Sequence, residues 1–369
     1  MNASRINTLR KLLVKNRIDA LLVLIEENRL YLSGFSGEDH QCDESAGALL
    51  ITQKRLILAT DSRFAVQAGN EAPLFNVVIY RKGLAKMLPD LAKRHNICKL
   101  GFESVRVTVR QINEYKKELS AAAVKIELIP LEDLVEGMRL IKSEEEIEKT
   151  RQALSLAESV YRNVVCGLRP GMTEKEVAWS MERGMREAGA DALAFPVIVA
   201  AGTNSALPHA IPTDRPIAVG EPILFDWGAR LNSYCSDTSR TVILGTPDAI
   251  FLKVYQTVLE AQQKALAAIK SGVSSKTVDS VARQYIRRRG YKGKFGHGLG
   301  HGTGLAVHEG PRLSPIKESV LQAGMILTVE PGVYLPQWGG VRIEHQVVVQ
   351  EEGAMVLNQL STSFDINAI

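Results

Sequence analysis

Two rhythms of hydrophobic and polar positions run through the first 130 residues. From Ser4 to Val14 apolar residues recur at i, i+3 and i+4, which predicts a helix, and the strand-like segment DALLVLI follows. Alternating segments predict further strands in NRLYLSGF, GALLIT and RLILAT. Helical stretches at residues 85–95 and 109–120 then alternate with the strand-like CKLGFE and KIELIP. The pattern predicts a mixed α/β domain over residues 1–130.

A polar segment, LEDLVEGMRLIKSEEEIEKT, separates this domain from the rest of the chain. Ser143 and Glu146 have the spacing of a capping box, so we expect a helix that begins there and ends near Val165, where LRPGM follows. These signals predict a linker over residues 131–142 and a second domain over residues 143–369.

The second domain contains an internal repeat. RPGMTEKEVA and KSGVSSKTVDSVA each begin a helix, the first at Thr173 with Glu176 as its capping-box partner and the second near Ser274. A glycine-rich stretch with a histidine follows each helix, SALPHAIP in one copy and LAVHEGP in the other. Matching approaches, AVGEPILFDWG and QAGMILTVEPG, then lead to a strand that ends in an acid. The chain is therefore expected to use one α/β unit twice, about a pseudo-twofold axis.

Each copy carries two acids on strand-like runs, Asp226 and Asp237 in the first and Glu330 and Glu344 in the second. A pseudo-twofold would bring all four into one pocket, where like charges raise carboxyl pKa values unless cations screen them. Two divalent ions would neutralise the four charges, and paired metals are a known hydrolytic arrangement. A histidine of FGHGLGHGTG would complete the ligand set, with the choice between two histidines left open by the repeat. Oxygen ligands with one imidazole favour manganese, cobalt or iron.

Composition narrows the class of protein. The 45 basic and 41 acidic residues leave a net charge of +4, and 45% of the chain is hydrophobic, so a disordered chain or a basic nucleic-acid arm is excluded. The four cysteines are far apart and form no C-x-x-C pair, which suits a reducing compartment. The longest apolar run near the N-terminus, Ala20 to Ile25, is too short for a signal peptide or a membrane span. We expect a cytoplasmic protein without nucleic-acid or membrane partners.

Four segments carry a resemblance to a known family: DWGARLNSYCSDTSRT, GHGTGLAVHE, LTVEPGVY and GGVRIE resemble signature blocks of the pita-bread metallopeptidases. The similarity is to their proline-specific branch, the Xaa-Pro aminopeptidases and Xaa-Pro dipeptidases. GFSG, TDSRFAVQA and MRLIKSEEEIEKTRQA extend it to nearly the whole chain. The resemblance implies an α/β (α+β) chain, with a creatinase-like N-terminal domain followed by a pita-bread catalytic domain.

The same resemblance implies the activity and its partners. It implies a dinuclear-metal exopeptidase that cleaves between an N-terminal residue and proline, so the substrate is a peptide with proline at the second position. Two divalent ions per subunit are implied, manganese first, with cobalt, iron or zinc as alternatives. A homodimer is also implied.

Carried over residue by residue, the resemblance assigns site roles. It implies five metal ligands: Asp226, Asp237, His301, Glu330 and Glu344. Of these, Asp237 and Glu344 would bridge the two ions. Glu330 would also shuttle the proton, while His209 and His308 would hold the substrate and stabilise the tetrahedral intermediate. His297 would line the pocket, and Arg342 would support the bridging glutamate or the substrate. Arg312 is a candidate for binding a dipeptide's terminal carboxylate, with an exposed loop arginine as the alternative.

Two departures and several alternatives accompany this interpretation. His345 replaces the family's usual acid, giving VRIEHQ where VRIED is common, and the polar loop from Glu38 to Ser45 is longer than usual. The choice between aminopeptidase and dipeptidase stays open. A metal-free binding module with the same fold is the alternative from another class. A methionine aminopeptidase is disfavoured because such enzymes usually lack a full N-terminal domain.

Overall fold

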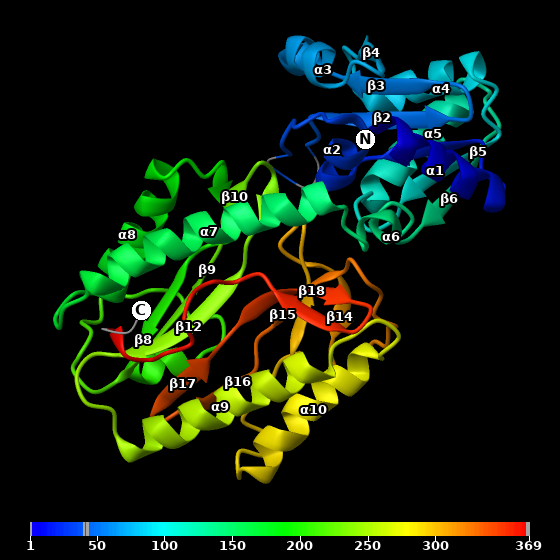
Figure 1. Ribbon diagram of the computed structural model, residues 1–369. Coiled ribbons are helices and arrows are strands. Elements are labelled where there is room, and N and C mark those ends of the chain that lie inside the picture. Colours follow the sequence, from blue (N-terminus) through cyan, green and yellow to red (C-terminus); the bar gives the residue numbers. More distant parts are fainter. Residues whose placement is uncertain (1, 40, 42–43, 367–369) are drawn as a thin grey trace. The chain divides into compact units, whose positions relative to one another are not determined.

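The computed structural model describes residues 2–39, 41 and 44–366, and the chain divides into two compact units, Met1–Met138 and Arg139–Ile369 (Figure 1). Both units mix helices and strands, so the expected α/β class is confirmed. Among the described residues, no helix combines the length and apolar character that crossing a bilayer requires.

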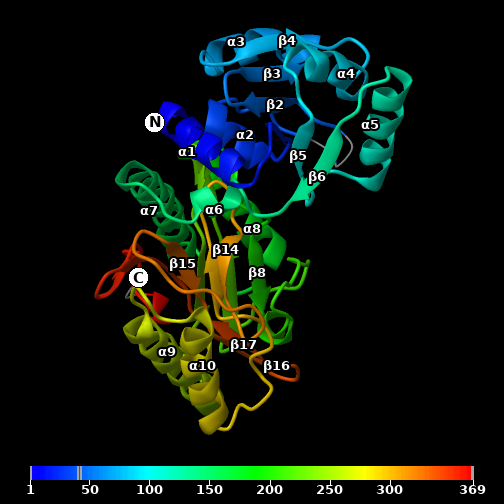
Figure 2. The same ribbon diagram turned by 90° about the vertical axis from the view of Figure 1, so that its right-hand side faces the viewer.

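A six-stranded mixed sheet forms the centre of the N-terminal unit. Its order is β4 (Asn76–Ile79), β3 (Leu56–Thr60), β2 (Gly47–Thr52), β1 (Ala20–Val23), β5 (Lys99–Glu103) and β6 (Glu127–Leu131). Strand β2 is antiparallel to both of its neighbours, and the other pairs are parallel. Figure 2 shows α1 (Asn2–Lys15) and α5 (Val109–Ala121) on opposite sides of this sheet. Leu22 of β1 packs in one core with Leu88 of α4 (Leu84–Arg94) and Leu119 of α5.

One predicted strand of this unit is wrong. The alternating segment NRLYLSGF lies mainly in a helix, α2 (Glu26–Ser33), which ends at Gly34 in the left-handed conformation, with φ 88°. Tyr31 and Leu32 are adjacent in sequence and both buried, which a strand with one buried face does not allow. An alternation over so few residues also fits a helical face, so the surrounding packing decided between them.

The polar loop after α2 is only partly described, because residues 40, 42 and 43 lie outside the described residues. In the described part, the carboxylate of Asp39 accepts hydrogen bonds from Arg29 and Arg106. Short helical segments that the sequence analysis did not predict complete this part of the chain: η1 (Ser62–Phe64), α3 (Ala65–Glu71) and α6 (Glu136–Arg139).

Long helices flank the strands of the second unit. The helices are α7 (Glu144–Cys166), α8 (Glu174–Glu187), α9 (Ala249–Ala268) and α10 (Ser275–Arg288). Figure 1 shows α7 and α8 beside the strands of the first repeat, and α9 and α10 beside those of the second. The expected capping boxes at the starts of α7 and α8 are both formed, at Ser143 with Glu146 and at Thr173 with Glu176.

The strands of this unit form several small sheets. A three-stranded sheet has the order β12 (Thr238–Ile243), β9 (Pro222–Trp227) and β8 (Ile198–Ala201), and a five-stranded sheet has the order β14 (Glu309–Leu313), β13 (Gly300–Gly302), β15 (Ile326–Val329), β18 (His345–Gln350) and β19 (Gly353–Val356). The strands β16 (Gly332–Leu335) and β17 (Gly339–Arg342) form a hairpin. The remaining elements are β7 (Ala192–Leu193), β10 (Ala229–Leu231), β11 (Tyr234–Cys235) and η2 (Gly202–Ala206).

Backbone hydrogen bonds confirm the internal repeat. Before α8 the amide of Gly171 donates to Ile217, and before α10 the amide of Gly272 donates to Leu321, both at 2.8 Å. Isolated antiparallel bridges occur at equivalent places, Thr173 with Pro216 and Ser274 with Val320. The glycines six residues before the paired acids, Gly220 and Gly324, have φ values of 85° and 86°. The two copies therefore share their turns as well as their helices.

Candidate metal centre

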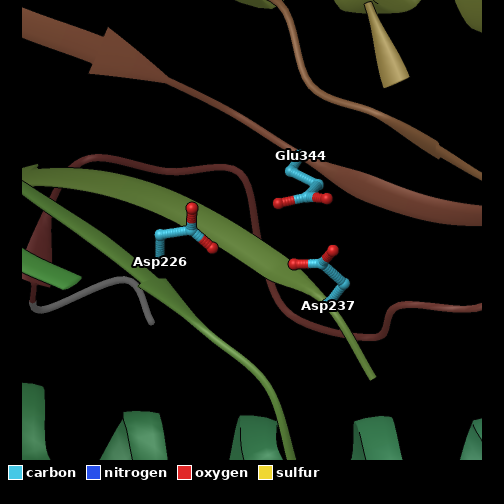
Figure 3. Close-up of side chains that lie close together, drawn as sticks. All are labelled: Asp226, Asp237 and Glu344. Atoms are coloured by element: carbon cyan, nitrogen blue, oxygen red, sulfur yellow. The ribbon is translucent and has the colours of Figure 1, made fainter. Parts of the chain in front are cut away.

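Three carboxylates from neighbouring strands point toward one another (Figure 3). Asp226 lies near the end of β9, Asp237 just before β12, and Glu344 between β17 and β18. One oxygen from each lies within 4.8 Å of the others, and Asp237 and Glu344 are 5% and 1% exposed. Strand pairing explains the meeting: Asp226 lies opposite Ser239 of β12, and the Ser239 hydroxyl donates to Glu344 Oε2 at 2.8 Å.

His301 reaches the same cluster from the second copy of the repeat, the copy that also carries Glu344. It lies on β13, and its Nδ1 is 3.0 Å from the carbonyl oxygen of Gly302, which places the proton on Nδ1. Its Nε2 is 3.5 Å from Asp237 Oδ2 and 3.5 Å from Glu330 Oε1. The unprotonated nitrogen therefore faces the carboxylates, the arrangement in which an imidazole can bind a metal.

Glu330 follows directly on β15, and its backbone amide donates to Leu299 at 2.8 Å. Its Oε1 accepts a hydrogen bond from the Thr328 hydroxyl at 3.3 Å. The structure thus brings together all five residues of the expected ligand set. The ring nitrogens of His297, the other histidine of the glycine-rich segment, instead face the Gly298 carbonyl and the Tyr334 hydroxyl.

The pKa values reflect this crowding of acids. Burial and the neighbouring acids raise the pKa values of Asp237 and Glu344 well above their ordinary range. Burial also raises the pKa of Glu330 to about 8, although Arg342 opposes the rise. Burial lowers the pKa of His301 to about 3, so its imidazole is neutral at physiological pH. Without cations the site therefore holds protons.

The donor set fits divalent cations. Asp226 Oδ1 and Glu344 Oε1 are buried and find no hydrogen-bond partner among the described residues. Such oxygens cost free energy unless a proton or a cation satisfies them. Several carboxylate oxygens and one neutral imidazole nitrogen suit oxygen-preferring metals such as manganese.

Arg342 links the acids to a second group of residues. Its guanidinium donates to Asp226 Oδ2, to the Ser239 hydroxyl at 2.8 Å and to the Tyr334 hydroxyl at 2.9 Å. His297 Nδ1 faces the carbonyl of Gly298 at 2.8 Å, so Nε2 is the acceptor for the Tyr334 hydroxyl, also at 2.8 Å. Burial, together with Arg342, lowers the pKa of His297 to about 4, and the ring is neutral. His297 therefore supports Tyr334 and Arg342.

The carboxylates open into a cavity of about 680 Å³ within the second unit. His209, His308 and Arg312 line it together with apolar side chains, Phe195, Ile198, Ile211, Val307 and Ile316. The ring of His308 lies 4.4 Å from that of His301 between centroids, and burial lowers the pKa of His308. His209 and Arg312 are both exposed, and both line this cavity.

Sequence reasoning missed two hydroxyl groups of this site. Ser239 lies two residues beyond Asp237, and an alternating strand therefore places the two side chains on one face. Tyr334 lies four residues beyond Glu330, and the hairpin of β16 and β17 brings it to Arg342. Only the first of these had a local sequence signal.

His345, the departure after Glu344, is half-buried and lies opposite Val329 in the pairing of β15 with β18. Its Nδ1 finds no partner among the described residues, and burial lowers its pKa to about 3. In the described part of the chain it therefore adds neither a charge nor a hydrogen bond to the neighbouring carboxylates.

A repeated α/β unit that brings a buried cluster of carboxylates together with a histidine fits the class of metal-dependent hydrolases. Residues 148–351 match the family described as Metallopeptidase family M24, and residues 5–141 match the Creatinase/Prolidase N-terminal domain. An Xaa-Pro dipeptidase of Pyrococcus horikoshii is 36% identical over 345 residues, 94% of each chain.

Solved structures agree. An Xaa-Pro dipeptidase from Bacillus anthracis has a TM-score of 0.92 at 36% identity, covering 98% of this chain and 99% of its own. An X-Pro aminopeptidase from Thermotoga maritima has a TM-score of 0.89 at 38% identity, covering 97% and 98%. The chain belongs to metallopeptidase family M24 and is a metallo-exopeptidase, a hydrolase that depends on divalent metal ions. The metal-free binding module is not supported.

Proposed function

We propose that this enzyme hydrolyses the peptide bond between an N-terminal residue and a following proline. The observation that carries the proposal is the convergence of Asp226, Asp237 and Glu344, with His301 and Glu330 beside them, at the floor of a largely apolar cavity. The names of the relatives support the preference for proline, because they are Xaa-Pro dipeptidases and an X-Pro aminopeptidase.

These same five residues would hold the two divalent ions that we propose. When bound, the ions would supply Lewis acidity and would lower the pKa of a bound water. Manganese is our first choice, ahead of cobalt, iron and zinc, because the donors are mostly oxygen atoms. Ser239 and Arg342 orient the carboxylates through their hydrogen bonds to Glu344 and Asp226.

Glu330 is proposed to move the proton. It lines the cavity beside His301, within reach of a water and a substrate bound there, which is the position that a general base requires. It would accept a proton from the attacking water and pass it to the proline nitrogen as the peptide bond breaks. His209 and His308 are proposed to hold the substrate and to donate hydrogen bonds to the developing oxyanion. His297 is assigned a supporting role through Tyr334.

The assay compares Xaa-Pro and Xaa-Pro-Yaa peptides with Xaa-Ala controls, using the purified enzyme reconstituted with each of the four metals. Release of the first residue from proline peptides only, fastest with manganese, is expected. No release with any metal refutes the proposal, and equal cleavage of the alanine peptides refutes the proline preference.

Arg312 is the candidate for distinguishing dipeptidase from aminopeptidase activity. It lies on β14 opposite His301, exposed at the cavity, where a guanidinium can pair with a substrate carboxylate. We expect Arg312→Ala to slow dipeptide turnover more than tripeptide turnover. Arg287→Ala, at the end of α10, is the matched control. Unchanged dipeptide turnover rules this role out.

The remaining proposals concern the whole protein. We propose domains at residues 1–130 and 143–369 with a linker at 131–142, a homodimer, and a cytoplasmic location. Sedimentation velocity and fractionation of cells test the last two.

A further inference from the structure

Glu174 is a fully buried acid that the proposed mechanism does not use. It is the first residue of α8 and lies between Thr173 and Glu176. Thr173 and Glu176 already cap the N-terminus of the helix through their capping box. The Glu174 side chain is 0% exposed, a rare condition for a glutamate. A buried carboxylate needs strong donors, and Glu174 takes them from a segment outside its own helix.

Its donors lie at the two ends of one loop. Oε1 accepts from the backbone amide of Ala201 at 2.7 Å, where β8 ends. Oε2 accepts from the backbone amide of Thr213 at 2.9 Å and from the Thr213 hydroxyl at 2.7 Å. The side-chain amide of Asn204, inside the loop, donates to the same oxygen at 2.8 Å. One carboxylate thus joins the entry and the exit of residues 202–212.

The helix backbone strengthens the same attachment. The amides of Glu174 and Lys175, unpaired within the helix because they belong to its first turn, donate to the carbonyls of Arg215 and Thr213 at 3.2 and 3.1 Å. The helix dipole also favours an acid at this end. The start of α8 therefore holds the loop exit by both its side chain and its backbone.

This loop carries His209 and part of the cavity wall, including Pro208 and Ile211. On its inner side, Arg342 donates to the Pro208 carbonyl at 3.2 Å, and the amide of Gly340 donates to the Ser205 hydroxyl at 2.8 Å. The loop is thus fixed at its base by Glu174 and at its inner edge by β17. His209 itself is exposed and forms no hydrogen bond with the residues that the structure describes, so its place depends on the loop.

We propose that Glu174 is a positioning residue that clamps the two ends of loop 202–212 and thereby places His209 against the substrate. The role of His209 rests on the proposed function, whereas the clamp itself does not. The second copy of the repeat has Ser275 of α10 at the position equivalent to Glu174. The Ser275 hydroxyl accepts from the Ser319 amide at 3.0 Å. Among the described residues its contacts therefore lie at one end of the corresponding loop, and it does not join two ends. The carboxyl group, with two oxygens, stands in the half of the repeat that carries His209.

The first test measures the clamp without any activity. Hydrogen–deuterium exchange of residues 201–213 is compared for wild type, Glu174→Gln, Glu174→Ala and the control Glu176→Gln, all loaded with manganese and matched for metal content. Glutamine can accept through only one of its two side-chain heteroatoms, so it should raise exchange less than alanine. Unchanged exchange in Glu174→Ala, or an equal rise in the exposed control, overturns the clamp.

The second test asks whether Glu174 acts through His209. A double-mutant cycle compares kcat and KM on an Xaa-Pro peptide for Glu174→Ala, His209→Ala and the double variant, well below their unfolding temperatures. We expect Glu174→Ala to reduce kcat/KM by about 10- to 100-fold. The loss should fall on whichever of kcat and KM is changed by His209→Ala. In the His209→Ala background, Glu174→Ala should reduce kcat/KM by less than about twofold. Additive losses overturn the positioning role even if exchange rises. If wild type cleaves no proline peptide, the proposed function fails and the exchange test alone decides on the clamp.

Discussion

Glu309 forms a buried ion cluster beside His308, and its removal should cost more stability than the removal of either neighbour. Its carboxylate accepts from Arg139 and, at 3.0 Å, from Lys142, and the three side chains are only 2–7% exposed. Burial by itself would raise the pKa of Glu309, but Lys142 and Arg139 together lower it. Both cations therefore contact this one carboxylate, and Glu146 adds a weaker attraction for Lys142.

The two substitutions differ in what they leave behind. At 3.0 Å and an effective dielectric constant near 20, the attraction between Lys142 and Glu309 is about 5.5 kcal/mol before desolvation is subtracted. Glu309→Gln removes the carboxylate that both buried cations contact, a change that typically costs about 3–5 kcal/mol. Lys142→Met leaves Glu309 paired with Arg139 and removes the cost of burying the ammonium, so about 1 kcal/mol or less is expected.

Tryptophan fluorescence can follow this unfolding selectively, because Trp179, Trp227 and Trp338 all lie in residues 139–369. Urea unfolding of metal-matched proteins gives the free energy of each variant. The lowered pKa means that the carboxylate stabilises the fold above its unfolded pKa near 4.5, and that this contribution is lost as the pH falls through the folded value. The gap between wild type and Glu309→Gln should therefore narrow in acid. If Lys142→Met costs as much as Glu309→Gln, the charge argument is wrong.

Three further predictions follow from the site and the N-terminal sheet. Metal binding at pH 7 should release about one proton or more, because Glu330, with a pKa of about 8, and the crowded Asp237 and Glu344 hold protons without metal. Calorimetry in buffers of different ionisation enthalpy measures this release, and no release contradicts the prediction. Tyr334→Phe removes the hydroxyl between His297 and Arg342 and should lower kcat/KM by about 10-fold or more, with unchanged metal content, and an effect below twofold contradicts the link. Burial raises the pKa of Glu103 to about 7, so between pH 4.5 and 7 the folded protein keeps a proton that the unfolded chain has released. Wild type should therefore lose up to about 3 kcal/mol of unfolding free energy from pH 4.5 to 7. Urea unfolding followed by circular dichroism measures this loss, and Glu103→Gln should not show it.

The sequence determined the class of the fold and the candidate ligands because those features are local or repeated. Capping boxes at Ser143 and Thr173 involve residues three apart, so their spacing predicted where two helices begin. The matched glycines and acids of the two copies revealed the repeat, which the backbone hydrogen bonds around Gly171 and Gly272 confirm. Motif resemblance selected His301 among the histidines of the glycine-rich segment, a choice that the repeat left open.

Tertiary structure decided what depends on groups far apart in the chain. The segment after β1 became a helix because its adjacent apolar residues are both buried, which alternation over a few positions could not show. His297 turned toward Tyr334, 37 positions later, and Arg342 toward Asp226, 116 positions earlier. Glu174 reads in the sequence as one more acid in a helix's first turn, where the dipole favours it. Only folding brings both ends of the His209 loop to its carboxylate, because those donors come from residues 27 and 39 positions away.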